Sequence, residues 1–335
     1  MSVTIGDLVD RTYREYLEPM EDIVSYTTLT TAINTTATSV EFDGNLLSVE
    51  EEDALDAGAI IEIGQELMFC KSLNAVTNTI TVTRAARGTT AASHSIGDLI
   101  KIAPPFPRKN VFDAVCDQIK NLFPTLFAVE TQEVIANSGY TLLGTYDSPG
   151  TNNYLVSVLK CISQYTDFES GTDQTSTIFR PVSVSMVQLP NPFTYTDSGG
   201  TERTITYTSG PNQVNALQFY NILSGHKTFV TFKKKFVEPT AESDTLATVG
   251  LEDEYEPIIM AGVAAQLISG KDIPAATTDY ITDQMAVSNF PVGSANSVRN
   301  SLLQYQQLLI TQARKYLRAK YPESVEVNGV NTGVQ

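Results

Sequence analysis

The apolar residues near the start of the chain follow helical spacing. Thr4 and Asp7 come first, in the positions of a capping box in which Asp replaces the usual Glu. Behind them, the side chains of one face recur every three or four residues, at Leu8, Val9, Thr12, Tyr13, Tyr16 and Leu17. This spacing predicts an amphipathic helix that begins after Thr4 and is closed by Pro19.

From Tyr26 to Pro104 the hydrophobic pattern changes from helical spacing to alternation. Short Thr-rich runs alternate apolar and polar residues, and turn residues such as Asp43-Gly44 and Gly97-Asp98 separate the runs. We expect strands at 27–33, 38–42, 59–63, 65–70, 79–83 and 99–102. Short strands at this spacing are typical of a small antiparallel β-domain.

After a proline-rich connector at 104–107, the pattern predicts a helix at 110–123 and further strands at 154–162, 177–187, 204–208 and 228–236. Long polar linkers are expected between these strands, at 144–153, 167–174 and 191–203. In the last strand, Val230 and Phe232 alternate with polar residues before the basic run Lys233-Lys234-Lys235. Because lysines protect exposed strands from aggregation, we interpret this run as part of a solvated edge strand.

Two more helices are predicted near the C-terminus. Pro257 suits the first turn of a helix at 258–268, and acidic residues precede it. The longest predicted helix covers 294–320 and is ended by Pro322. Its apolar stripe and its basic last turns comprise Val298, Leu302, Tyr305, Leu309, Ala313 and Tyr316, and Arg314, Lys315, Arg318 and Lys320.

Together these elements predict an α+β protein. A helical body would be built from both termini and the middle of the chain, with two inserted antiparallel β-regions, a small β-barrel or sandwich and a larger β-sandwich. The expected parts are an N-terminal helix at 1–22, a small β-domain at 23–106, a helix of the body at 107–125, a second β-domain at 126–240, a C-terminal helical region at 241–323 and a flexible tail at 324–335.

Composition and charge narrow the classes of function. The 335 residues include 38 Asp and Glu against 22 Lys and Arg, which gives a formal net charge of −16 at pH 7. This acidity argues against a general nucleic-acid binder, because such a protein needs clustered cations to neutralise phosphates. The 42% apolar content is that of a globular protein. We expect neither a membrane-spanning helix nor a secretion signal.

Candidate catalytic and metal-binding residues are few. Cys70, Cys116 and Cys161 are far apart in sequence, so we expect thiols in a reducing compartment. The acidic run at 50–56 lacks the alternating spacing of a calcium loop and is interpreted as a solvated loop. His94 lies between two serines, but adjacency in sequence does not create the geometry of a triad. The sequence therefore predicts no enzyme, no cofactor, and no catalytic or metal-binding residues.

Interaction residues are expected on the last helix and on the acidic cluster that precedes residue 258. Two interpretations remain open for the basic end of this helix. Its cations pair with the acidic cluster, within one chain or on a neighbouring copy, or they only complement the helix dipole and stay solvated. The candidate interaction residues are Val298, Leu302, Tyr305, Leu309, Arg314, Lys315, Arg318, Glu252, Asp253 and Glu254.

The segment 28–104 resembles a small β-module that recurs in virion proteins of tailed bacteriophages. The most specific part is an R-x-x-R-G-T-x-A-x-x-H pattern that begins at Arg84 and ends at His94, and the runs 38–42 and 58–68 also match. Ala85 stands where that family commonly has Gly. From the residues themselves we expect a tight turn at Arg87-Gly88 and hydrogen-bonding loop residues at Thr89, Thr90 and His94.

The resemblance implies a structural virion protein. The amphipathic helices at both termini and the apolar helix at 258–268 resemble those of head-to-tail adaptor or neck proteins, which implies a homo-oligomeric ring between portal and tail. The implied partners are further copies of the chain, the portal protein, tail or neck proteins, and genomic DNA that passes through without sequence-specific binding. No membrane partner is implied. The implied location is the neck or tail of the virion, and the host cytoplasm during assembly.

Two alternatives stay open at this point. The module also occurs in tail and baseplate proteins, so a tail or baseplate hub component is the first alternative. The second is a receptor-binding or carbohydrate-binding virion protein, for which exposed aromatic side chains would be needed. The suggestive aromatic residues are Phe193, Tyr195 and Tyr207, although a role in the core of a strand fits them as well.

Overall fold

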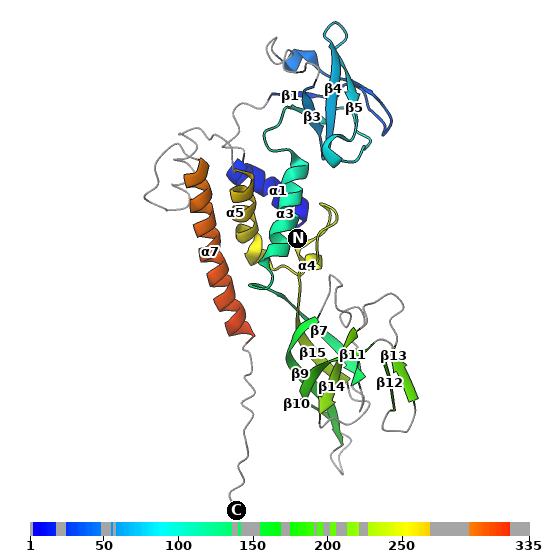
Figure 1. The fold of residues 1–335 in the computed structure, drawn as a ribbon, viewed down its shortest axis with the longest axis vertical. Coiled ribbons are helices and arrows are strands. Elements are labelled where there is room, and N and C mark those ends of the chain that lie inside the picture. Colours follow the sequence, from blue (N-terminus) through cyan, green and yellow to red (C-terminus); the bar gives the residue numbers. More distant parts are fainter. Residues whose placement is uncertain are drawn as a thin grey trace, which may run out of the picture. The chain divides into compact units, whose positions relative to one another are not determined.

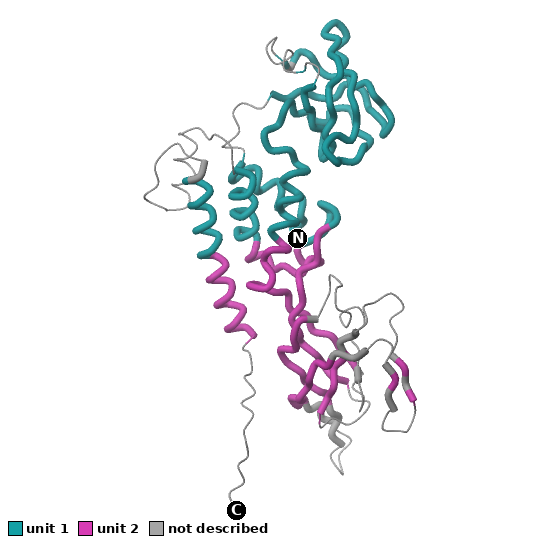
Figure 2. The backbone as a smooth tube through the Cα atoms, viewed as in Figure 1, with its two compact units in different colours: residues 1–118, 240–245, 256–308 teal, residues 119–239, 246–255, 309–335 magenta. Residues whose placement is uncertain are grey.

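A computed structural model shows a mixture of helices and antiparallel β-sheets, which makes the protein an α+β protein (Figure 1). The structure describes residues 3–17, 25–47, 55, 58–135, 140–141, 155–168, 175–190, 193–196, 202–205, 213–220, 227–268 and 295–321. The chain divides into two compact units (Figure 2). Unit 1 comprises residues 1–118, 240–245 and 256–308, and unit 2 comprises residues 119–239, 246–255 and 309–335.

The helices α1 (Ile5–Thr12), α3 (Arg108–Leu122), α5 (Glu256–Leu267) and α7 (Ala295–Lys320) lie where apolar spacing predicts them. The short helix α4 (Leu246–Val249) was not predicted. A π-helical turn, Tyr13–Leu17, continues α1. The capping box at Thr4 is confirmed, because the Asp7 backbone N–H donates to the Thr4 hydroxyl at 3.1 Å and the Thr4 N–H donates to the Asp7 carboxylate at 2.9 Å.

A six-stranded antiparallel sheet forms the β-region of unit 1. Its strands are ordered β1 (Tyr26–Thr28), β6 (Leu99–Ile102), β3 (Ile60–Ile63), β4 (Glu66–Asn74), β5 (Thr79–Thr83) and β2 (Ser39–Glu41). Each strand overlaps a run that alternation predicts, although β1 ends at Thr28 and is shorter than expected, and β4 continues to Asn74, beyond its predicted end at Cys70. The core beneath the sheet is aliphatic and includes Leu29, Val40, Ile61, Ile63, Met68, Ile80, Val82 and Ile100.

Arg108, the first residue of α3, links this β-region to the helices of unit 1. Its backbone N–H donates to the Glu62 carboxylate on β3 at 2.7 Å. Its guanidinium binds Glu242 through Nε and Nη2, both at 2.9 Å, and Asp10 of α1 through Nη1 at 2.5 Å. One side chain therefore connects α1, α3 and the segment 240–245.

α5 contacts the other helices of unit 1. Its sequence is apolar on every side, and nine of its residues are buried. Gln118 of α3 donates to Gln266 at 2.9 Å, and Gln306 of α7 donates to the Ile258 carbonyl at 3.2 Å. At Gly262 these helices approach so closely that a Cβ would overlap the side-chain amides of Gln118 and Gln306. A larger residue at this position would force these two side-chain amides to move.

The described residues of unit 2 form three small antiparallel sheets. The largest has the order β10 (Thr175–Pro181), β9 (Leu155–Phe168), β15 (Lys227–Lys234), β7 (Ala128–Ile135). A second sheet has the order β11 (Ser183–Pro190), β14 (Gln213–Tyr220), β8 (Tyr140–Thr141), and a third pairs β12 (Phe193–Thr196) with β13 (Glu202–Ile205). Side chains from the first two sheets share one core, formed by Val134, Cys161, Leu217, Phe219, Val230 and Phe232.

The edge-strand interpretation of the lysine run is wrong. β15 lies inside its sheet, because it pairs with β9 on one side and with β7 on the other. Lys234 is only 8% exposed, and its Nζ lies 2.5 Å from a carboxylate oxygen of Glu130 on β7. Strand alternation correctly separates Lys234 from Lys233, but a partner on a neighbouring strand makes a central lysine tolerable.

Other strand predictions in unit 2 also need correction. The run 177–187, predicted as one strand, forms β10 and β11 with a break at Val182. The strands β7, β8 and β14 were not predicted, and β12 lies in a stretch that was expected to be a linker. Several predictions lie outside the described residues: the acidic loop at 50–53 and Asp56, Pro19, Pro322, Tyr207, the linker 144–153 and the tail 324–335.

Candidate functional site

Glu66, at the start of β4, is the centre of a buried polar network inside the β-region of unit 1. Its side chain is 1% exposed. Arg84 donates to both carboxylate oxygens, from Nε and from Nη2, each at 2.6 Å. This is the bidentate geometry in which an arginine binds a carboxylate most strongly. Arg84 also donates to three backbone carbonyls, those of Asn34, Ala37 and Ala92.

Three further donors form hydrogen bonds with the same carboxylate. The backbone N–H groups of Ala85 and Ala92 donate to it at 3.2 and 3.0 Å, and His94 Nε2 lies 2.9 Å from Oε2. Burial raises the pKa of Glu66, but the hydrogen bonds from Arg84, Ala92, His94 and Ala85 outweigh it and lower the pKa to about 2. The network therefore holds a fully ionised carboxylate in the interior of the module.

The tight turn predicted after Arg84 is confirmed, and so are the hydrogen-bonding roles of Thr89 and His94. Arg87 and Gly88 have φ values of 52° and 80°, as a tight turn with left-handed backbone requires. The Thr89 hydroxyl donates to the Ala86 carbonyl at 2.8 Å and accepts from the Leu67 N–H at 3.2 Å. Ala85 also has a positive φ of 54°, so the backbone here has the conformation that glycine adopts without strain.

The residues of the R-x-x-R-G-T-x-A-x-x-H pattern thus build a structural centre. Arg84 and His94 bind Glu66, and Thr89 ties its loop to β4. The sequence did not single out Glu66, because an acidic residue in a strand of alternating pattern is expected to face the solvent. Its position directly after the turn Gly64-Gln65, at the head of an apolar strand, is the signal that marks it.

The predicted interaction residues of α7 separate into two groups. Val298 and Leu302 are 1% and 0% exposed and belong to the core of unit 1, so they are not available to a partner in this state. Tyr305 and Leu309 are half-buried. The three predicted cations of the last turns, Arg314, Lys315 and Arg318, are exposed.

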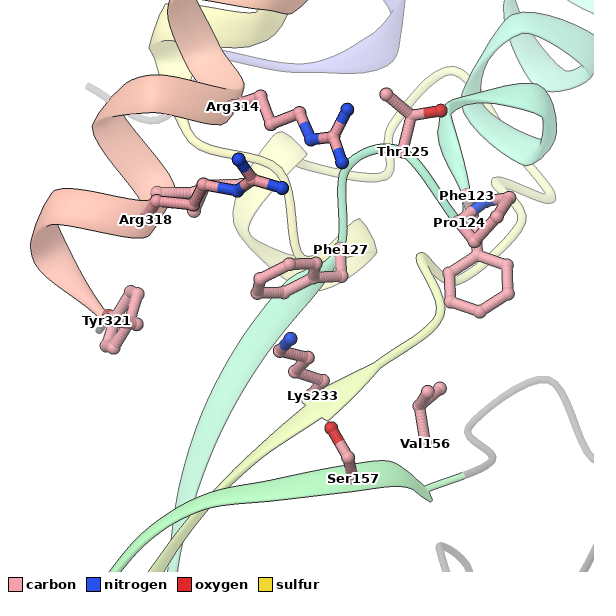
Figure 3. A pocket seen from close by; sticks show the side chains of 11 residues that line it. Phe123, Pro124, Thr125, Phe127, Val156, Ser157, Lys233, Arg314, Arg318 and Tyr321 are labelled. Atoms are coloured by element: carbon pink, nitrogen blue, oxygen red, sulfur yellow. The ribbon is translucent and has the colours of Figure 1, made fainter. Parts of the chain in front are cut away.

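Arg314 and Arg318 line a pocket of about 200 Å³ in unit 2. Figure 3 shows their guanidinium groups extending from α7 toward Thr125 and Phe127. Lys233 of β15 enters the same pocket, with its Nζ 4.4 Å from the centre of the Phe127 ring. The remaining walls come mainly from the segment after α3, from the start of β9 and from the end of α7, and are Phe123, Pro124, Val156, Ser157, Leu317 and Tyr321.

The acidic cluster before α5 has a partner on α7, but not one of the three predicted cations. Glu252 accepts from Lys320 Nζ at 2.8 Å. This hydrogen bond raises the pKa of Lys320. Asp253 and Glu254 are exposed, and within the described part of the chain no cation lies within ion-pair distance of either. The next residue, Tyr255, is buried and packs its ring against Phe236, which anchors the acidic turn.

Other predicted features are placed as follows. Cys70, Cys116 and Cys161 are buried thiols that form no disulfide, and burial raises the pKa of Cys70 to about 11 and that of Cys161 to about 12. Phe193 and Tyr195 lie on β12. Among the residues that the structure describes, no three His, Cys, Asp or Glu side chains form a group that could hold a metal ion. None of the described helices is long and apolar enough to cross a membrane.

Comparison with known proteins adds no relative to these observations. No protein-family model matches the chain, and no curated protein matches it in sequence.

Proposed function

We propose that this chain is a structural component of a tailed-phage particle, a head-to-tail adaptor or neck protein that forms a ring between portal and tail. The observation that carries the proposal is the network around Glu66. The likeness of the segment to the phage module depends on three side chains, Arg84, Thr89 and His94. These side chains hold the loops of the segment together. A structural role of the motif suits a protein that forms part of a particle, because assembly depends on rigid, preformed surfaces.

The arrangement of elements supports the same function. We propose a helical body, formed by elements from both termini and the middle of the chain, with the β-regions 23–106 and 126–240 inserted as a small β-barrel or sandwich and a larger β-sandwich. In unit 1, α1, α3 and the start of α7 each contact α5. Such a body offers helices for docking on a portal, and the β-regions supply separate surfaces for tail or neck proteins.

The charge of the chain fits a DNA conduit. A formal charge of −16 repels phosphates, so DNA in transit is not trapped on the surface. The partners in this proposal are further copies of the chain, the portal, and tail or neck proteins. The protein acts in the virion, and in the host cytoplasm while particles assemble.

The proposal is tested by adding the purified protein to a ring of the portal encoded in the same genome and measuring the mass of the complex. An adaptor joins the portal in matching stoichiometry and is found at the neck when antibodies label whole particles. Labelling at the baseplate or at fibre tips would favour a tail or receptor-binding role instead. Absence of the protein from purified particles would overturn the whole proposal.

A further inference from the structure

The pocket at the end of α7 concentrates positive charge on an acidic protein. Arg314 and Arg318 lie one turn apart on α7, and both extend into the pocket together with Lys233 (Figure 3). Over the residues described, no carboxylate lies within ion-pair distance of Arg314 or Arg318. In a chain with a net charge of −16, two neighbouring guanidinium groups without a carboxylate form a binding site for anions.

The walls of the pocket strengthen that attraction. Phe127 and Phe123 provide apolar surface beside the cations, and apolar walls lower the local dielectric constant and reduce screening by salt. Arginine forks favour planar anions that accept two hydrogen bonds, which describes a carboxylate. The pocket therefore suits a short peptide segment with two adjacent carboxylates.

Such a segment is present on the surface of the same protein. Asp253 and Glu254 are consecutive and exposed on the turn Asp253–Tyr255. The turn is held on both sides, because Tyr255 is buried and Glu252 is bound to Lys320. We call Asp253 and Glu254 on this turn the acidic knob. Because the turn is rigid, the knob loses little conformational entropy when it binds.

We infer that the pocket of one copy receives Asp253 and Glu254 of a second copy, so that Arg314 and Arg318 form part of the contact between subunits. This inference rests on the proposed function, which requires the copies to associate. Highly acidic copies repel one another, and an interface that joins a basic pocket to an acidic knob removes that repulsion locally. Double-stranded DNA is the less suitable occupant, because three cations neutralise too few phosphates for stable binding.

Two charge-reversed proteins test the contact. The pocket variant is Arg314→Glu with Arg318→Glu, and the knob variant is Asp253→Lys with Glu254→Lys. We expect each variant alone to associate with itself at least tenfold more weakly than the wild-type protein, as measured by sedimentation and native mass spectrometry. A 1:1 mixture should regain the wild-type mass, because each pocket in an alternating assembly then meets a knob of opposite charge. Lys315→Glu is the matched control, since Lys315 is exposed on the same helix but does not line the pocket.

The outcomes are distinct. A chain that carries both sets of changes could regain the wild-type mass while the 1:1 mixture does not. That result would show that the pocket and the acidic turn pair within one chain, and it would overturn the inference. A wild-type protein that stays monomeric, or variants that keep the wild-type mass, would also overturn it. If the pocket variant keeps its mass but loses retention of a DNA duplex at low salt, the pocket is a phosphate site. In each of these cases binding to the portal ring is measured separately, so the proposed function can stand while this contact fails.

Discussion

Arg84 holds both oxygens of the Glu66 carboxylate, with its Nε and Nη2 each 2.6 Å from one of them. The two residues are 18 positions apart in sequence, and His94, which also contacts Glu66, is joined to Ile33 by two backbone hydrogen bonds. A charge pair with this degree of burial is strongly destabilising when only one partner is removed.

Glu66→Gln should therefore destabilise unit 1. The change leaves the Arg84 guanidinium buried without its counter-charge, and we expect a loss of about 3 kcal/mol in the free energy of unfolding. Urea denaturation, combined with hydrogen exchange at the amides of β4, measures this loss. Glu41→Gln is the matched control, because Glu41 is an exposed carboxylate on β2, and it should change stability by less than about 0.5 kcal/mol.

The same carboxylate should make stability depend on pH. The pKa of Glu66 is about 2 in the folded protein, below its ordinary value of 4.5, so the folded state binds fewer protons than the unfolded state. Its contribution is therefore complete above about pH 4.5 and is lost as the pH falls toward 2, and amounts to about 3 kcal/mol. Stability curves of the wild-type protein and Glu66→Gln should converge across this window. Parallel curves would contradict the assignment.

Ala85→Gly should stabilise the module. Ala85 has a φ of 54°, a conformation that costs a residue with a Cβ about 1 kcal/mol relative to glycine. We expect a gain in unfolding free energy somewhat below that value, because glycine also increases the entropy of the unfolded chain. Ala86→Gly is the control, since Ala86 lacks a positive φ, and the change should destabilise by about 0.5–1 kcal/mol. Equal effects at the two positions would refute the strain argument.

Gly262→Ala should destabilise unit 1 although alanine is the better helix former. Intrinsic propensity favours alanine by about 1 kcal/mol, but a Cβ at this position overlaps the amides of Gln118 and Gln306. We expect a net loss of about 1 kcal/mol, because overpacking costs about 2 kcal/mol and propensity returns about half of it, and thermal unfolding measures this loss. Adding Gln306→Ala should recover part of the loss if the overlap is its cause. A stabilised Gly262→Ala protein would show that the helices separate at little cost.

The candidate site could be predicted only in part. The exposed cations Arg314 and Arg318 follow from their place at the polar end of an amphipathic helix. The sequence does not predict that they lie beside Lys233 and Phe127. Those residues are about 80 and 190 positions away, and only tertiary packing brings them to one pocket. Val298 and Leu302 illustrate the opposite error, since an apolar stripe alone does not reveal whether its own chain or a partner covers it.

Local sequence by itself determined the elements: the capping box at Thr4 starts α1, alternation marks the strands of unit 1, and apolar residues on every side identify α5 as a buried helix. These features depend on neighbours within a few residues, whose steric and hydrogen-bonding preferences act in any context. Only the tertiary structure decided that β15 is a central strand, that Lys234 is neutralised by Glu130, and that Glu66 is a buried anion. Each of these outcomes depends on a distant partner, because a charge can be buried only where the fold supplies its counter-charge.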